Sequence, residues 1–202
     1  MTQSTKALVH SGFASIPGEG EVAGLFNIPA VEVKSAPHHS GQDTSDIWLT
    51  PPFIIDALGG ADSFDLDPAT PLTMPWPTAK RRYTIEDNGL TSAWAGRVWL
   101  NPPYSRPAYS RFMGRMAEHG HGTALIFART ETRTFSDAVW KAATAVLFLA
   151  GRLNFYGPDG KPGKANAGAP SVLCAYGDTD AEILRCSGLD GAFIDLRRSL
   201  AA

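Results

Sequence analysis

Four consecutive residues, Asn101-Pro102-Pro103-Tyr104, have the side chains and the stiffness needed to hold an amino group while it reacts. The Asn carboxamide carries an acceptor oxygen, and each proline lacks an N–H group and has a fixed φ. A residue that precedes proline is also pushed toward extended backbone, so the turn has few conformations. The Asn101 side-chain oxygen and the Pro102 carbonyl could accept the two hydrogens of one aromatic amine. Such contacts strengthen as positive charge develops on the nitrogen, which favours the transition state.

The same turn follows an apolar run, Val98-Trp99-Leu100, which we predict to be a buried strand. In open α/β sheets, ligands bind beyond the carboxyl ends of the strands, which is where this turn would lie. Tyr104 could stack on a planar base there, a contact worth about 1–3 kcal/mol. The alternative interpretation is a proline-rich surface turn with an aromatic ring packed on it.

Two further segments place acidic residues after predicted strands. Residues 64–69 read as a short strand that ends in Asp65 and Asp67, and Asp87 follows after a loop. Acidic residues at strand ends commonly hold ribose hydroxyls or an adenine amino group in doubly wound sheets. Taken singly, each is also typical of a turn or a helix cap.

With these segments in this order, the chain resembles the phage N6-adenine DNA methyltransferases, a Dam-like family found in phages and prophages. The resemblance spans roughly residues 45–177. Its motifs are Asp46-Ile47-Trp48-Leu49-Thr50-Pro51, Phe64-Asp65-Leu66-Asp67-Pro68-Ala69, Tyr83-Thr84, Asp87-Asn88-Gly89-Leu90, Trp94, Gly96-Arg97-Val98-Trp99-Leu100-Asn101-Pro102-Pro103-Tyr104, Gly151-Arg152-Leu153-Asn154-Phe155 and Pro170-Ser171-Val172.

This resemblance implies S-adenosylmethionine as methyl donor and adenine in DNA as acceptor. Asn101, Pro102, Pro103 and Tyr104 match the catalytic motif of the family. Adenine N6 cannot react inside a stacked duplex, so the base would be flipped out or lie in single-stranded DNA. The Asp-Pro-Ala step at residues 67–69 resembles the start of the usual cofactor motif, although its glycine-rich continuation is absent.

Seven residues are candidates for the cofactor site. We expect the acidic strand end to line the pocket, the next motif to lie near the cofactor's adenine, and a helix start to close the methionine end. Thr50 would be the N-cap of that helix, with proline in its first turn. Asp65, Asp67 and Pro68 would line the pocket, and Asp87 or Leu90 would lie near the adenine of the cofactor. Thr50 and Pro51 would begin the helix at the methionine end.

Five cationic residues are candidates for contacts with DNA phosphates. Three follow predicted strands, at the edge of the sheet where Asn101 is expected. The other two belong to the glycine-rich loop at residues 157–166, which could follow a groove of the DNA. Surface residues with no such role, and an idle hairpin loop, are the alternatives. The five are Arg106, Arg129, Arg133, Lys161 and Lys164.

Composition is that of a globular protein: of 202 residues, 44% are apolar and 19% charged. We read residues 1–44 as a flexible N-terminal arm and residues 45–202 as one methyltransferase domain. The formal net charge of −2 means that DNA contacts would use local basic patches.

Neither the two cysteines nor the histidine pairs have the spacing of a metal site. No apolar run is long enough to span a bilayer, so we expect no membrane partner and a cytosolic location.

Strands alternate with helices, which predicts a Rossmann-like class I methyltransferase fold: an α/β protein with a mainly parallel sheet covered on both faces. We predict helices over residues 53–58, 107–118, 135–142 and 180–185. Strands are expected at 64–67, 97–100, 123–127, 145–149, 153–156 and 171–176. The last two strands would form an antiparallel hairpin at the edge of the sheet.

Alternative functions fit the same residues. RNA adenine or a protein side-chain amide presents a similar planar amino group. A non-catalytic protein that binds DNA, or blocks a host factor, could also use this fold. The sequence leaves the target site and the oligomeric state open.

Overall fold

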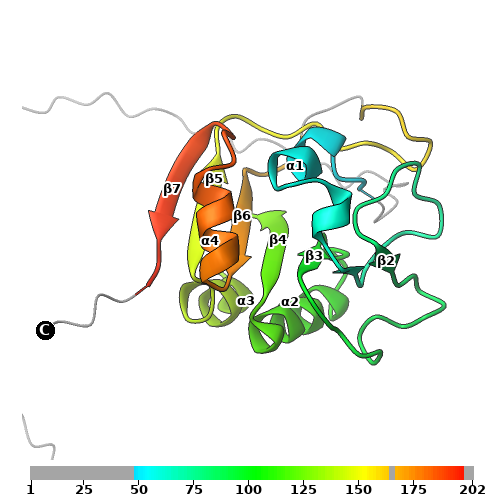
Figure 1. Cartoon of the computed structure of the whole chain (residues 1–202), viewed down its shortest axis with the longest axis horizontal. Helices are drawn as coiled ribbons and strands as arrows, with labels where there is room; N and C mark the ends of the chain where they lie inside the picture. The colour runs from blue at the N-terminus through cyan, green and yellow to red at the C-terminus, as the bar shows by residue number, and fades with distance from the viewer. Residues whose placement is uncertain (1–47, 164–166, 198–202) are drawn as a thin grey trace, which may run out of the picture. The chain divides into compact units, whose positions relative to one another are not determined.

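The computed structural model describes residues 48–163 and 167–197, and a seven-stranded mixed sheet forms its centre (Figure 1). The strand order is β2-β1-β3-β4-β6-β5-β7. From β2 to β4 all neighbours are parallel, whereas β6 pairs antiparallel with β4 and β5, and β7 pairs antiparallel with β5. The strands are β1 (Leu66–Asp67), β2 (Arg81–Arg82), β3 (Val98–Leu100), β4 (Gly122–Phe127), β5 (Ala145–Leu149), β6 (Ser171–Tyr176) and β7 (Gly191–Asp195).

Helices cover both faces of this sheet, as predicted, but the sheet is not mainly parallel, because three of its six strand pairings are antiparallel. Side chains alternate along a strand, so Val98 and Leu100 of β3 join one core cluster while Trp99 joins the other. The first cluster also holds α2 (Ala108–His119), α3 (Arg133–Phe135) and the π-helical segment η2 (Ser136–Trp140). The second holds α1 (Pro52–Ala57) and α4 (Asp178–Arg185), and a short 3₁₀ turn, η1 (Ala61–Ser63), follows α1. The protein is thus an α/β protein compatible with a methyltransferase-like fold.

Helix α2 shows why these residues form a helix. Phe112 and Met113 lie four and three residues before Met116, so the three share one helix face, and all are buried against the sheet. The helix ends at Gly120, whose φ of 67° is the left-handed conformation that a glycine adopts most easily.

The start of α1 differs from the prediction. Pro51 is the N-cap residue, and no side chain caps the helix. The Thr50 hydroxyl instead accepts a hydrogen bond from the Asn101 side chain at 3.2 Å. The cap prediction was therefore wrong, because Thr50 lies one residue too early and its hydroxyl is bound by Asn101, the residue after β3.

The predicted edge hairpin is also wrong. Residues 153–156 form no strand, and β6 lies inside the sheet between β4 and β5. Leu153 and Phe155 are buried and Asn154 is exposed, so the alternating pattern is real. Their carbonyls, however, accept from Ala167 and Gly163 of the following loop. The actual antiparallel edge is β7, which the sequence analysis missed.

A buried ion pair joins the strands to α4 at the end of the sheet where β3 begins. Arg97 Nε donates to Asp180 Oδ1 at 2.8 Å, and Thr123 Oγ1 donates to the same oxygen at 3.0 Å. Arg97 Nη1 donates to the Leu58 carbonyl and to Ser63 Oγ, at 3.0 and 2.7 Å. This cluster therefore fixes α1, η1 and α4 on one face of the sheet.

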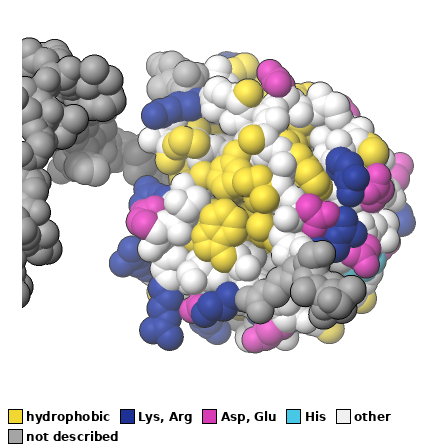
Figure 2. All heavy atoms as spheres, turned by 90° about the vertical axis from the view of Figure 1, so that its left-hand side faces the viewer, with side chains coloured by type: hydrophobic (Ala, Val, Ile, Leu, Met, Phe, Trp, Pro, Cys, Tyr) yellow, Lys and Arg dark blue, Asp and Glu magenta, His cyan; other side chains and the backbone are white. Residues whose placement is uncertain are grey.

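Beyond the core, the face of the molecule at the β7 edge carries a group of hydrophobic side chains (Figure 2). Trp140 and Ile194 are among the exposed large hydrophobic residues. In the described part of the chain, no helix has the length and apolarity needed to cross a membrane. The predicted arm at residues 1–44 lies outside the described residues.

Candidate active site

A cavity of about 540 Å³ opens beyond the carboxyl ends of β1 and β3. Strand β1 has β2 on one side and β3 on the other, so the chain reverses its winding direction between β1 and β3. Such a switch point is where open α/β sheets bind ligands. The cavity is lined by Trp48, Leu49, Thr50, Asp67, Pro68, Ala69, Thr70, Pro71, Met74, Thr78, Thr84, Ile85, Asn88, Gly89, Leu90, Trp99, Asn101, Pro102, Pro103, Tyr104, Ser105, Ala108 and Phe112.

The Asn101 side chain has a defined orientation on the wall of this cavity. Its Nδ2 donates to the Trp48 carbonyl at 2.7 Å and to Thr50 Oγ1 at 3.2 Å. A carbonyl can only accept, so the nitrogen must face Trp48. The Asn101 Oδ1 atom is buried and has no hydrogen-bond partner among the described residues. A buried acceptor without a partner costs about 1–3 kcal/mol and is satisfied when a donor enters.

The remaining residues of the turn supply a second acceptor and an aromatic wall. The Pro102 carbonyl accepts no hydrogen bond from any described residue. The Tyr104 ring lies nearly parallel to those of Phe127 and Tyr109, with centroids 4.3 and 5.7 Å away. Burial raises the pKa of Tyr104 well above its usual range, with the neighbouring Tyr109 adding to the effect. Tyr104 therefore stays a neutral phenol.

Asp67 is a buried carboxylate at the end of β1. Its oxygens accept from Thr78 Oγ1 at 2.5 Å and from the Ala69 N–H at 3.0 Å. Burial raises the pKa of Asp67, and these two hydrogen bonds oppose that shift. The carboxylate thus fixes the turn after β1 and brings Thr78 to the cavity wall.

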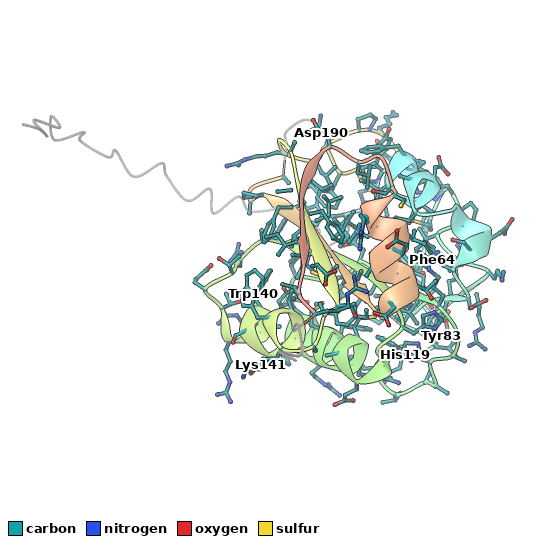
Figure 3. All side chains as sticks on the ribbon, turned by 60° about the vertical axis from the view of Figure 1, so that its left-hand side comes forward. Phe64, Tyr83, His119, Trp140, Lys141 and Asp190 are labelled. Carbon is teal, nitrogen blue, oxygen red and sulfur yellow. The ribbon has the colours of Figure 1, made fainter. Side chains whose placement is uncertain are left out.

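The loop after β2 closes the side of the cavity that faces α2. Gly89 packs so tightly that a Cβ there would overlap the Pro68 carbonyl. The Gly89 carbonyl accepts from Trp94 Nε1 and Arg115 Nη1, at 2.8 and 2.9 Å. Tyr83 and His119 (Figure 3) bond the far end of the loop, at the Ala93 and Gly96 carbonyls. Leu90 is therefore presented to the cavity from a firmly anchored loop.

The profile of the family "DNA N-6-adenine-methyltransferase (Dam)" matches residues 38–185 of this chain. The chain belongs to the Dam family. A curated relative, the DNA N-6-adenine-methyltransferase of Escherichia phage T1, is 30% identical over 127 residues. The match covers 58% of this chain and 52% of the phage protein, so the chain spans about half the length of that relative. No solved structure matches the chain.

In this Dam-family chain, most of the predicted turn and cofactor residues meet at the cavity. Asn101, Pro102, Pro103 and Tyr104 line it together with Thr50, Asp67, Pro68 and Leu90.

Three predicted cofactor residues do not line the cavity. The Asp65 carboxylate accepts the Arg97 N–H at 2.8 Å and pairs with Lys80 at 3.0 Å, and these contacts lower its pKa. Asp87 bonds the N–H and hydroxyl of Thr84, which lowers its pKa as well. Pro51 only caps α1. The two carboxylates therefore shape turns of the Dam-family chain.

The four predicted DNA-contact residues that the structure describes are exposed, but two of them are paired with carboxylates. Arg129 follows β4, and its charge acts on the pKa of Tyr104, so it lies near the turn at residues 101–104. Arg106 is exposed beside that turn. Arg133 pairs with Asp137 at 3.3 Å, and Lys161 lies 3.9 Å from Asp159. Lys164 lies outside the described residues.

Sequence reasoning missed several residues of the site. Trp48 holds Asn101 through its backbone carbonyl, and Thr78 lines the cavity while its hydroxyl donates to Asp67. Trp99 was assigned to a strand, yet it also lines the cavity, with a buried Nε1 that has no partner in the described part. The sequence did give a signal for Trp48, because it shares a motif with Thr50, but that motif was interpreted as the start of a helix.

Proposed function

We propose that this protein transfers the methyl group of S-adenosylmethionine to N6 of adenine in DNA. Membership of the Dam family supports adenine in DNA as the acceptor. The observation that carries the proposal is the orientation of Asn101: its nitrogen is held by Trp48 and Thr50, and its buried oxygen is free at the cavity.

The cavity residues fit the methyl donor. A volume of about 540 Å³ is within the range of small-molecule sites, and most of the wall is apolar. Pro68 and Leu90 would hold the adenosine part, and Thr50 and the Trp99 Nε1 would offer polar contacts to the methionine part. When bound, the donor supplies an electrophilic methyl group.

The chain's own contribution is to hold the amine. Adenine N6 is a weak nucleophile because its lone pair is delocalised into the ring. The Asn101 Oδ1 and the Pro102 carbonyl would accept its two hydrogens and favour a pyramidal nitrogen. Both acceptors are fixed before the reaction, so little reorganisation is needed as positive charge develops. The two prolines keep the second acceptor in place.

Tyr104 would form a flat wall for the target base. Its ring already packs on Phe127 and Tyr109, so the wall loses little conformational entropy when a base arrives. The base must leave its duplex to reach this cavity, unless the DNA is single-stranded.

The strand order supports the finer fold assignment as well. We infer a Rossmann-like class I methyltransferase fold, with β1 and β3 at the switch point and β6 as the antiparallel strand between β4 and β5. Arg106, Arg129 and Arg133 follow or flank the carboxyl ends of β3 and β4. They would bind the phosphates beside the target base.

A labelled-donor assay tests the proposal. Purified full-length protein is incubated with methyl-labelled S-adenosylmethionine and with double-stranded DNA, single-stranded DNA, RNA or lysate protein. We expect N6-methyladenine in nucleoside digests of DNA. Label found only in RNA or in protein would overturn the assignment of the acceptor. Calorimetry that detects no donor binding would support a non-catalytic protein instead.

A further inference from the structure

Three segments distant in the sequence come together next to Asn101. They are residues 48–50, residues 74–78 between β1 and β2, and residues 155–163 between β5 and β6. In Figure 1 the loop after β5 extends to the side of the sheet where the β1–β2 loop lies. A Cβ at Gly160 would lie 3.0 Å from Pro75, which confirms that the two loops touch.

Paired contacts make the two loops one unit, which we call the loop platform (residues 74–78 and 155–163). The rings of Trp76 and Tyr156 meet edge to face with centroids 5.1 Å apart. The backbones of Leu49 and Tyr156 exchange two hydrogen bonds, at 2.9 and 3.0 Å. Trp76 Nε1 donates to the Thr50 carbonyl at 3.2 Å. Both loops are therefore tied to the segment that orients Asn101.

The tip of the platform is polar and stiff. The Gly157 N–H donates to the Lys161 carbonyl at 2.9 Å, and the Lys161 N–H donates to Asp159 Oδ1 at 3.1 Å. The side chains of Lys161 and Asp159 are 80% and 62% exposed, and their charged atoms are 3.9 Å apart. A carboxylate and an ammonium group on a preformed turn can read base edges, since acidic groups accept from cytosine N4 and lysine donates to guanine.

We propose that the loop platform reads the DNA bases that flank the target adenine, with Asp159 and Lys161 as its contacts. This inference rests on the proposed function, because it requires DNA in the cavity beside it. The platform adjoins the segment whose Trp48 carbonyl and Thr50 hydroxyl hold the Asn101 amide. Contact with matching flanking bases is thereby linked to the position of the catalytic oxygen.

Two measurements on the full chain test this inference. The first compares wild-type protein, the double variant Asp159→Ala/Lys161→Ala and the control Lys141→Ala on a DNA duplex library with random bases around one adenine. Lys141 follows η2 (Figure 3), next to α3, on the other side of the molecule from the platform in Figure 1. Sequencing of the methylated molecules gives the preference at each flanking position.

We expect the double variant to lose preference on the order of 10-fold at one or more flanking positions, the size of one base contact. The control should keep the wild-type profile. An identical profile in the double variant, with methylation intact, would overturn the inference and leave the proposed function standing.

The second measurement does not depend on catalysis. A photo-crosslinking residue, p-benzoylphenylalanine, replaces Lys161 or, as control, Lys141, and each protein is irradiated with the duplex. Crosslinks to DNA from position 161 and not from position 141 are expected. Crosslinks without any methylation would refute the proposed function alone, and absent or equal crosslinking would refute the platform.

Discussion

Asn101 can act as an acceptor because its nitrogen is already occupied. Trp48 and Thr50 take the two amide hydrogens, and Oδ1 is left on the cavity wall. An asparagine free to rotate would present nitrogen and oxygen equally and would lose this preorganisation. The hydrogen bonds of this one side chain therefore determine that the target amine would meet its oxygen and not its nitrogen.

Asp67 gives a pH prediction at the same scale. Burial raises its pKa above the ordinary value of 3.8, so the folded state binds its proton more tightly than the unfolded chain does. The free energy of unfolding should thus fall as the pH rises from about 3.8 through the folded pKa. The variant Asp67→Asn lacks this proton and should gain stability relative to wild type across that window.

Urea unfolding of both proteins at several pH values measures this difference. The exposed carboxylates with lowered pKa, such as Asp65 and Asp195, are common to both proteins and cancel. Parallel stability curves for wild type and Asp67→Asn would refute the assignment.

The structure places residues 101–104 on the cavity wall, as predicted, but of the three predicted acidic residues only Asp67 lies there. Residues 101–104 directly follow one strand, so the local sequence was sufficient to place them. Asp65 and Asp87 were assigned by type and position, but their carboxylates bond the backbone of Arg97 and Thr84. The sequence alone does not show whether a carboxylate at a strand end faces a ligand or stabilises its own turn.

Among the structural elements, the ion pair of Arg97 with Asp180 joins β3 to α4. Both side chains are almost fully buried, so the variant Arg97→Met would leave the buried Asp180 carboxylate with only the Thr123 hydroxyl and the more distant His121 ring beside it. We expect a loss of about 3–5 kcal/mol in the free energy of unfolding. Adding Asp180→Asn to Arg97→Met should recover part of it.

The matched control is Arg133→Met, because that side chain is 95% exposed in its pair with Asp137. Its free energy of unfolding should change by less than about 1 kcal/mol. Equal losses in the two methionine variants, measured by urea unfolding, would show that burial of the Arg97 pair contributes nothing.

Element prediction succeeded where periodicity and burial agree. Helix α2 and strands β4, β5 and β6 lie close to the predicted ranges because their apolar faces pack on the sheet. Residues 153–156 alternate like a strand but bond to loops, and β7 is largely exposed. Backbone pairing between distant segments decides both cases, and a pattern in one segment does not specify its partner.

For the whole molecule, a net charge of −2 leaves DNA binding to local cations. Arg129 lies near Tyr104 and is exposed, so it should contact a phosphate next to the target base. The variant Arg129→Ala should make the negative slope of log K against log salt shallower by about 0.9, the value for one phosphate contact.

Fluorescence anisotropy of a labelled duplex over a salt series gives this slope. Lys141→Ala removes one positive charge elsewhere and should leave the slope as in wild type. A slope unchanged by Arg129→Ala would remove Arg129 from the DNA interface.

The most direct test of the account is a single-turnover measurement of N6-methyladenine formation in DNA by Asn101→Ala. Asn154→Ala, an exposed asparagine outside the cavity lining, is the matched control. Losing one preorganised contact should slow methyl transfer on the order of 100-fold or more, while the affinity for S-adenosylmethionine stays largely unchanged. A wild-type rate in Asn101→Ala would contradict the account.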